Sequence, residues 1–279
     1  MSIFDQMLGR YDIITENDRK NAIYEVIQEI TLGGLYRGGF FNKAAFYGGT
    51  CLRIFHGIDR FSEDMDFSLI KSEPDFKLED YFSAIQNEFE AVGRDVEITK
   101  KDKKQSSKVE SAFLKDNTEV YNVSFQTERS IKVKIEVDID PPLSFDTEQK
   151  LMLQPFSFMT RCFVLPDLFA GKMHALVFRN WKNRVKGRDW YDFEWYVKQG
   201  VELNLKHLQT RIRQFNNVEM TKEEFLDKLK ERISSTNIEL VKRDVVPFIK
   251  NPTQLDIWSN NYFLQLVEMM KIKANTTQN

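Results

Sequence analysis

The sequence contains few cysteines, few glycines and prolines, and almost no net charge. Its two cysteines, Cys51 and Cys162, are too few for a disulfide framework, so we expect buried apolar side chains. With only 12 glycines and 7 prolines in 279 residues, long disordered stretches are not expected. The formal net charge of −2 is atypical of a protein that binds nucleic acid by overall electrostatics. Any such contact must therefore come from a local basic patch.

The sequence also lacks a long apolar run. No stretch is long enough to cross a bilayer, and the first five residues do not resemble a signal peptide. Hydrophobic residues make up 42% of the chain and charged residues 29%, a balance typical of a globular protein with a hydrophobic core. We therefore expect a soluble cytoplasmic protein with no membrane partner.

The hydrophobic periodicity predicts a mixed first half and a helical second half. In the first half, helices are expected at 16–32, ended by Gly33-Gly34, shortly after Gly48-Gly49 and at 77–92, and strands at 44–47, 64–70, 94–100, 119–126 and 131–140. In the second half, helices are expected at 167–179, 188–199, 203–215, 222–234, 237–248 and 257–272. This order indicates an α+β fold with two domains, residues 1–165 and 166–279.

Two motifs of the first half together indicate a phosphate and metal site. Gly48-Gly49-Thr50 lies between a predicted strand and a predicted helix, where backbone without Cβ atoms can approach a phosphate. Asp64 and Asp66 follow on the next strand, and their spacing places both carboxylates on one face. Such a pair repels unless a cation lies between them, and hard oxygen ligands favour Mg²⁺ or Mn²⁺. Each motif alone is more typical of a turn or a solvated surface.

These two motifs resemble the first motif of the polymerase-β-type nucleotidyltransferase superfamily, with Gly48-Gly49-Thr50 followed by Asp64-Met65-Asp66-Phe67. The resemblance implies a mixed sheet with helices and a third carboxylate from a neighbouring strand. Glu136 is the best match, because it lies between apolar residues on the 131–140 strand, and Asp138 on the same face is the alternative. Either acid would complete a two-metal site. Without a ligand, the same charged face is typical of an edge strand.

Longer motifs narrow the resemblance to the AbiEii/AbiGii-type toxins. The similar segments are residues 47–53, 60–67, 172–176 with Arg179, and 187–192, and the resemblance runs from about residue 30 to about residue 200. It implies a nucleotidyltransferase toxin of a bacterial toxin–antitoxin or abortive phage-infection system, with a cognate antitoxin. The related MenT toxins add nucleotides to tRNA acceptor ends. The main departure from the family pattern is Asp138-Ile139-Asp140 after the third acid.

The motifs of the second half add cations and acids to this site. Lys172 and Arg179 lie on one face of the 167–179 helix, since seven residues span about two turns. A site built only from acids would repel a triphosphate, so Lys172 is expected to bind a phosphate, and Arg179 either does the same or pairs with an acid. The resemblance implies that Asp189 is an active-site acid, which orients Lys172 or serves as a base, and that Asp192 supports it. Taken alone, these residues are equally typical of a helix surface.

Two basic stretches are weaker candidates for RNA contact: Lys100, Lys101, Lys103, Lys104 and Lys108, and Lys182, Lys186, Arg184 and Arg188. The first is more typical of a solvated loop, whereas the second adjoins the motifs around Lys172 and Asp189. The three histidines are not spaced as a metal site and are expected to be structural.

The sequence thus predicts a Mg²⁺- or Mn²⁺-dependent nucleotidyltransferase. An acceptor hydroxyl, which the resemblance places on RNA and specifically on tRNA, attacks the α-phosphorus of a nucleoside triphosphate (NTP). The metal is assigned to Asp64, Asp66 and Glu136, the triphosphate to Gly48, Gly49, Thr50, Lys172 and Arg179, and a further catalytic role to Asp189. Two alternatives stay open: a non-catalytic NTP- or GTP-binding toxin that acts through a partner, and a metal-dependent phosphoesterase.

Overall fold

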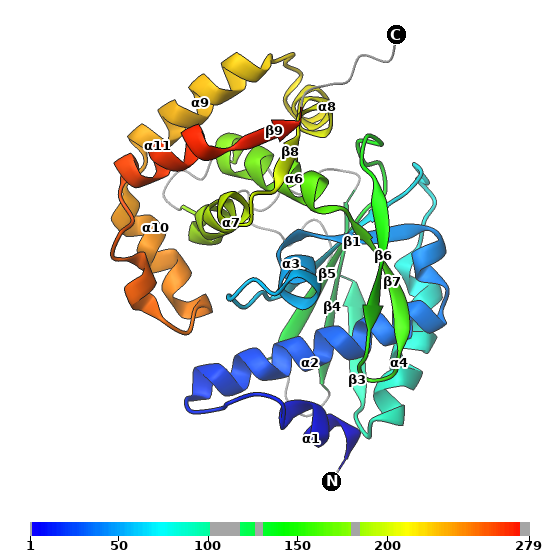
Figure 1. Ribbon diagram of the computed structural model, residues 1–279. Helices are drawn as coiled ribbons and strands as arrows, with labels where there is room; N and C mark the ends of the chain where they lie inside the picture. Colours follow the sequence, from blue (N-terminus) through cyan, green and yellow to red (C-terminus); the bar gives the residue numbers. More distant parts are fainter. Residues whose placement is uncertain (1, 101–117, 126–130, 180–184, 274–279) are drawn as a thin grey trace. The chain divides into compact units, whose positions relative to one another are not determined.

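The structure, a computed structural model, describes residues 2–100, 118–125, 131–179 and 185–273. It contains two compact units (Figure 1). The first, here called the sheet unit, comprises Met1–Gly57, Phe61–Leu143 and Thr147–Cys162. The second, the helical unit, comprises Ile58–Arg60, Ser144–Asp146 and Phe163–Asn279. The predicted α+β fold, a mixed sheet with helices followed by a helical region, is confirmed, whereas the domain bounds 1–165 and 166–279 stay a prediction.

A seven-stranded mixed sheet forms the centre of the sheet unit, with strand order β3-β4-β5-β2-β1-β7-β6. β2 runs parallel to β5 and antiparallel to β1, so the strand that carries Asp64 lies inside the sheet. The strands are β1 (Ala44–Tyr47), β2 (Asp64–Leu69), β3 (Val96–Lys100), β4 (Thr118–Phe125), β5 (Lys132–Asp138), β6 (Thr147–Met152) and β7 (Phe158–Phe163). The five predicted strands are confirmed. β6 and β7 were not predicted. The sequence of β6 shows no apolar alternation, and this strand buries only Met152.

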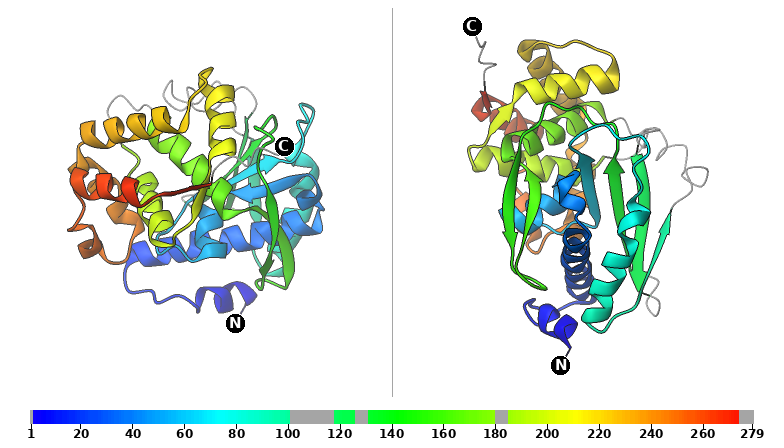
Figure 2. Two further views of the ribbon diagram at one scale, coloured as in Figure 1. Left: turned by 45° about the horizontal axis from the view of Figure 1, so that its top comes forward. Right: turned by 90° about the vertical axis from the view of Figure 1, so that its right-hand side faces the viewer.

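The helices of the sheet unit include one that is longer than predicted. They are α1 (Ile3–Leu8), α2 (Glu16–Arg37), α3 (Gly48–His56) and α4 (Phe82–Ala91), with 3-10 turns at Phe40–Asn42 and Leu78–Tyr81. The prediction that Gly33-Gly34 ends the first long helix is wrong, since α2 continues to Arg37. A Cβ on Gly34 would lie 2.5 Å from the Cα of Ile85, so this glycine allows α2 and α4 to pack closely (Figure 2).

In the sheet unit, the buried carboxylate of Glu29 on α2 forms an ion pair with Arg10. Burial raises the pKa of Glu29 from 4.5 to about 7, although Arg10 acts to lower it. A carboxyl group whose pKa is higher in the folded state binds its proton more tightly there. Its contribution to stability is therefore complete below pH 4.5 and is lost as the pH rises to about 7. This loss corresponds to about 3 kcal/mol.

Glu29→Gln is expected to remove this pH-dependent loss. Relative to the unchanged protein, the free energy of unfolding of the variant should rise by up to about 3 kcal/mol between acidic and neutral pH. Urea unfolding at a series of pH values measures the difference. Glu90→Gln, at an exposed position of α4, is the matched control and should show a constant difference. If the difference in free energy of unfolding between Glu29→Gln and the unchanged protein did not vary with pH, the prediction would be contradicted.

The helical unit consists mainly of helices, as predicted. They are α6 (Leu165–Phe178), α7 (Gly187–Lys198), α8 (Leu205–Asn216), α9 (Lys222–Ser235), α10 (Ile238–Val245) and α11 (Asn260–Met269), with 3-10 turns at Val246–Phe248 and Pro252–Leu255. A short parallel pair, β8 (Glu202–Asn204) and β9 (Lys271–Lys273), was not predicted, because three residues carry no periodicity. Trp190 and Tyr196 of α7 are buried in the core of this unit.

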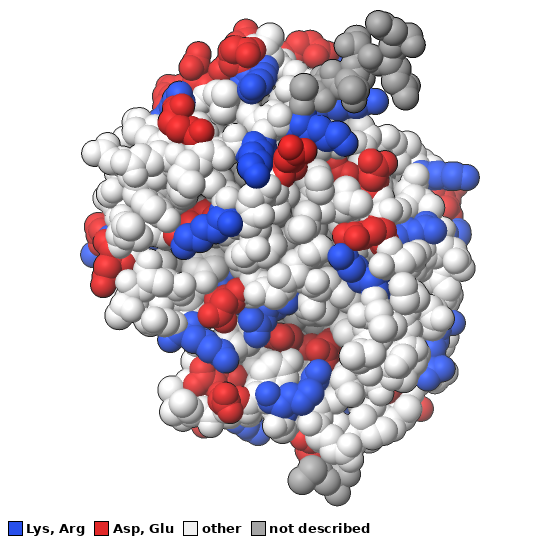
Figure 3. All heavy atoms as spheres, in the orientation of Figure 1, with Lys and Arg blue, Asp and Glu red and all other residues white. Residues whose placement is uncertain are grey.

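Charged side chains of both signs are interspersed over the face shown in Figure 3. This distribution agrees with a net charge of −2 and shows no extended area of one sign on that face. No helix among the described residues is long and apolar enough to cross a membrane. On this face, recognition of an anionic ligand would depend on particular local groups.

Candidate active site

Three of the predicted site residues lie together on one face of β2 and β5. In the parallel pairing of these strands, Asp66 is the register partner of Glu136, and Asp64 is the register partner of Lys134. All four side chains are half-buried, whereas the residues that alternate with them along both strands are buried. Side chains at paired positions of neighbouring strands lie close together on the same face. The fold therefore brings Asp64, Asp66 and Glu136 into one group.

The strand register favours Glu136 over Asp138 as the third acid. Asp138 lies two residues further along β5, opposite Ser68 rather than opposite an acid. Its Oδ1 atom accepts a hydrogen bond from the backbone N–H of Asp140 at 3.2 Å. Asp138 thus stabilises the end of its own strand, and Glu136 lies beside Asp66.

Glu136→Gln and Asp138→Asn form a matched pair that tests this choice. Glu136→Gln is expected to weaken Mn²⁺ binding at least about tenfold, because it removes a negatively charged ligand, and Asp138→Asn is expected to change it less than about twofold. Isothermal titration with Mn²⁺ measures both effects. The opposite order would assign the third ligand to Asp138.

Lys134 provides the positive charge among these acids. Its Nζ atom forms an ion pair with Glu136. Burial lowers the pKa of Lys134, but the carboxylates of Glu136, Asp64 and Asp66 raise it by more, so that the net shift is upward. Lys134 is therefore an integral member of the group.

Gly48 brings the predicted phosphate-binding loop against the acids. It follows β1 with a φ of +80°, a left-handed conformation that favours glycine. A Cβ at this position would lie 2.2 Å from the Oδ2 atom of Asp66, so the close approach also requires glycine. Tyr47, which precedes the first turn of α3, makes no side-chain capping bond to that turn. N–H groups at the start of a helix are in general a favourable position for an anion such as a phosphate.

Thr50 has a structural contact that the sequence did not indicate. Its side chain is buried, and its hydroxyl donates a hydrogen bond to the backbone oxygen of Asp64. Gln28 of α2 acts in the same region, since its Nε2 atom donates to the backbone oxygens of Ser62 at 2.9 Å and Glu63 at 3.2 Å. Both side chains fix the backbone at the start of β2. A polar residue on the buried side of a predicted helix is the signal that could have identified Gln28.

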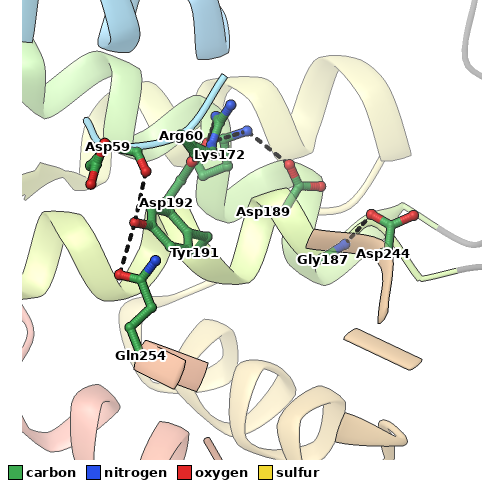
Figure 4. A network of polar contacts seen from close by, with 9 residues as sticks. All are labelled: Asp59, Arg60, Lys172, Gly187, Asp189, Tyr191, Asp192, Asp244 and Gln254. Carbon is green, nitrogen blue, oxygen red and sulfur yellow. Dashed lines mark hydrogen bonds and ion pairs between the residues drawn. The ribbon is translucent and has the colours of Figure 1, made fainter. Parts of the chain in front are cut away.

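In the helical unit, Lys172 is bound between two carboxylates (Figure 4). Its Nζ atom lies 2.8 Å from Oδ1 of Asp189 and 2.8 Å from Oδ2 of Asp192. Arg179 contributes a second cation, with its Nη1 atom 3.1 Å from Oδ2 of Asp189. The two carboxylates are nearly inaccessible, whereas the side chains of Lys172 and Arg179 keep 14% and 23% of their surface exposed. The network therefore presents cations, rather than carboxylates, to a ligand.

Arg60 anchors this network, because its guanidinium group forms a two-pronged ion pair with Asp192. Its Nη2 atom lies 2.6 Å from Oδ2 of Asp192, and its Nε atom donates to Oδ1. The two side chains are 1% and 0% exposed. Tyr191 holds the residue before Arg60, since its hydroxyl donates to the backbone oxygen of Asp59 at 3.1 Å. The sequence placed Arg60 in a motif without giving it this role.

The charge state of Asp189 separates its two predicted roles. Burial raises the pKa of Asp189, but Lys172, Arg179 and Lys186 lower it by more, and the net pKa lies far below the usual value. An acid that is this strongly held in its ionised form is a poor proton acceptor. The structure therefore favours the role in which Asp189 orients Lys172.

In the described residues, the two basic stretches and the histidines make mainly structural contacts. Lys100 pairs with Glu119 at 2.7 Å, and the other four lysines of the first basic stretch lie outside the described residues. In the second stretch, Lys182 and Arg184 also lie outside them, and Arg188 packs on the ring of Phe248 at 3.9 Å. Burial and nearby Arg179 lower the pKa of Lys186 to about 8. Two histidines make structural contacts: His174 with Asn216 at 2.8 Å, and His207 with Ser144 at 3.1 Å.

The acids fit a divalent metal in donor type and backbone position. Three carboxylates on one face supply the hard oxygen ligands that Mg²⁺ and Mn²⁺ prefer. Within the part of the chain that the structure describes, however, no three Asp, Glu, His or Cys side chains are grouped as a metal-binding cluster. The Glu136 carboxylate instead forms an ion pair with the ammonium group of Lys134.

Comparison with known families identifies the chain. The sequence profile described as "Nucleotidyl transferase AbiEii toxin, Type IV TA system" matches residues 31–266. The chain belongs to the AbiEii family. The match includes all four motifs from which the resemblance was inferred, and the prediction of this family is confirmed. This AbiEii protein is therefore a nucleotidyltransferase toxin of a type IV toxin–antitoxin system, which implies an antitoxin partner.

Solved structures support the fold of this AbiEii toxin. MenT4, a nucleotidyltransferase toxin from Mycobacterium tuberculosis, superposes with a TM-score of 0.62 at 14% identity, over 96% of this chain and 88% of its own. The Helicobacter pylori protein JHP933 gives a TM-score of 0.52 at 19% identity, over 92% of this chain and 91% of its own. Comparison with curated protein sequences finds no match. At these identities the structures establish the shared fold only.

Proposed function

We propose that this AbiEii toxin transfers a nucleotide from an NTP to a hydroxyl group of RNA, with tRNA as the first candidate acceptor, in a reaction that requires Mg²⁺ or Mn²⁺. The pairing of Asp66 with Glu136 on adjacent strands, beside Asp64, carries the proposal. The contact between Gly48 and the Asp66 carboxylate adds a phosphate-binding backbone next to these acids. The family supports nucleotidyl transfer as the reaction class.

Different residues of the chain have different roles in this reaction. Asp64, Asp66 and Glu136 hold the metal, and the N–H groups at the start of α3 bind phosphate oxygens. When bound, the metal activates the acceptor hydroxyl and neutralises charge on the triphosphate. The acceptor oxygen bonds to the α-phosphorus, the bond to the bridging oxygen breaks, and pyrophosphate leaves while the hydroxyl proton passes to water.

Lys172 is proposed to bind the triphosphate, as its sequence motif predicts, and Arg179 is proposed to assist it. The ion pairs with Asp189 and Asp192 support this role, because they fix the position of the Lys172 ammonium group. A cation that is ordered before the ligand arrives loses little conformational freedom on binding. We further propose that the reaction takes place in the cytoplasm, where NTPs and tRNA are available.

The test of this function is transfer of label to RNA. Purified toxin is incubated with total tRNA, Mg²⁺ and each NTP in turn, labelled either at the α- or at the γ-phosphorus. Label on tRNA from one α-labelled nucleotide, and none from its γ-labelled form, is the expected result. Release of labelled mononucleotide without incorporation would indicate a phosphoesterase. Saturable NTP binding with neither product would indicate a toxin that acts through a partner.

A further inference from the structure

Lys134 lies within the group of acids rather than beside it. It is the register partner of Asp64 on the adjacent parallel strand, and its ammonium group pairs with Glu136, two residues further along β5. Glu136 is in turn the register partner of Asp66. The four residues therefore occupy two successive positions on the same face of each of two adjacent strands. One lysine is thus placed among three carboxylates.

Three carboxylates on one face repel one another unless a positive charge compensates them. In this structure the compensating charge belongs to Lys134, which forms an ion pair with Glu136 and is the register partner of Asp64. The same carboxylates are not grouped as a metal cluster in the described part of the chain. The oxygen of Glu136 that pairs with Lys134 cannot at the same time bind a divalent ion in the same direction. A divalent ion that binds this oxygen from the same side therefore displaces the ammonium group.

We propose that Lys134 is an internal counter-ion that competes with the divalent metal for the catalytic carboxylates. It stabilises the site when no metal is bound and weakens the binding of free metal. The displaced ammonium group gains a new anionic partner only when a triphosphate arrives. Metal and NTP should therefore bind more tightly together than either does alone, by reciprocal coupling between the two ligands. The inference rests on the proposed metal site at Asp64, Asp66 and Glu136.

Lys134→Met, which removes the charge and retains an apolar side chain, tests the proposal. The variant is expected to bind Mn²⁺ about tenfold more tightly than the unchanged protein, because a competing cation is absent. In the chelator EDTA it should unfold at a lower temperature, and Mn²⁺ should raise that temperature by more than in the unchanged protein. Titration calorimetry and thermal unfolding measure the two effects, and neither requires turnover.

The coupling between metal and nucleotide is the second measurement. Mn²⁺ titrations are repeated in the presence of an NTP analogue that cannot transfer its α-phosphorus. In the unchanged protein the analogue should tighten Mn²⁺ binding, and in Lys134→Met it should do so several-fold less. Equal tightening in both proteins would contradict the coupling.

Two further variants serve as controls. Lys132 lies two residues earlier on the same face of β5 and is exposed, so Lys132→Met makes the same charge change away from the acids and should alter Mn²⁺ affinity less than about twofold. Lys134→Arg keeps the charge and should retain the weak affinity of the unchanged protein. Lys134→Gln replaces the methionine variant if the latter does not fold.

The outcomes separate this inference from the proposed function. Unchanged or weaker Mn²⁺ binding by folded Lys134→Met would overturn the counter-ion role, provided that Asp66→Asn abolishes Mn²⁺ binding. If Mn²⁺ binding persists in Asp66→Asn, the proposed metal site itself is wrong. Tighter Mn²⁺ binding by Lys134→Met, with unchanged Mn²⁺ affinity in Lys132→Met and Lys134→Arg, supports both the counter-ion role and the proposed metal site.

Discussion

Asp66→Asn is expected to reduce nucleotidyl transfer on the order of a thousandfold or more, while the fold stays intact. Asp66 lies opposite Glu136 on the adjacent strand, and its carboxylate touches the backbone of Gly48. The amide has the same shape as the carboxylate but lacks its negative charge, so metal affinity and positioning of the phosphate fall together. Single-turnover transfer of α-labelled nucleotide to tRNA measures the loss, and circular dichroism confirms folding.

Asp80→Asn is the matched control for Asp66→Asn. Asp80 is exposed in the 3-10 turn Leu78–Tyr81 of the same unit, so the substitution makes the same chemical change away from the acids. It should leave transfer unchanged. A folded Asp66→Asn protein that retains transfer within about tenfold of the unchanged toxin would contradict metal catalysis at this site.

Asp192→Ala is expected to destabilise the protein by about 3–5 kcal/mol, the usual cost of breaking a buried ion pair from one side. Asp192 binds the guanidinium group of Arg60 through both oxygens, and Lys172 through Oδ2. After truncation the nearly inaccessible Arg60 has lost this partner. Thermal unfolding followed by circular dichroism should show a decrease of roughly 10 °C.

A double variant tests whether the loss comes from breaking the Arg60–Asp192 ion pair from one side. Arg60→Met combined with Asp192→Leu removes both charges with similar volume, and Lys172 keeps its ion pair with Asp189. The double variant should recover most of the stability lost in Asp192→Ala. Asp256→Ala, at an exposed position of the same unit, should have little effect. A decrease of less than about 1 kcal/mol for Asp192→Ala would show that the pair contributes little.

The elements that the sequence predicted correctly are those with a strong local pattern. The alternation along β2 and β5 was sufficient to place Asp64, Asp66 and Glu136 on polar faces. Gly33 and Gly34 show the limit of local reasoning, since two adjacent glycines ordinarily end a helix. Here close packing of α2 on α4 stabilises the longer helix, and this packing is possible because glycine has no side chain.

The residue types and their spacing already indicated the expected chemistry of this toxin: paired acids on one strand face, a glycine turn before a helix, and the motifs of its family. Which of these groups meet depends on the fold of the whole chain. It placed Asp66 opposite Glu136, Lys134 opposite Asp64, and Arg60 against Asp192, which lies 132 residues away in the chain. The physical reason is that side-chain periodicity records which face of an element is buried. The register between distant strands and helices depends on packing that no local pattern encodes.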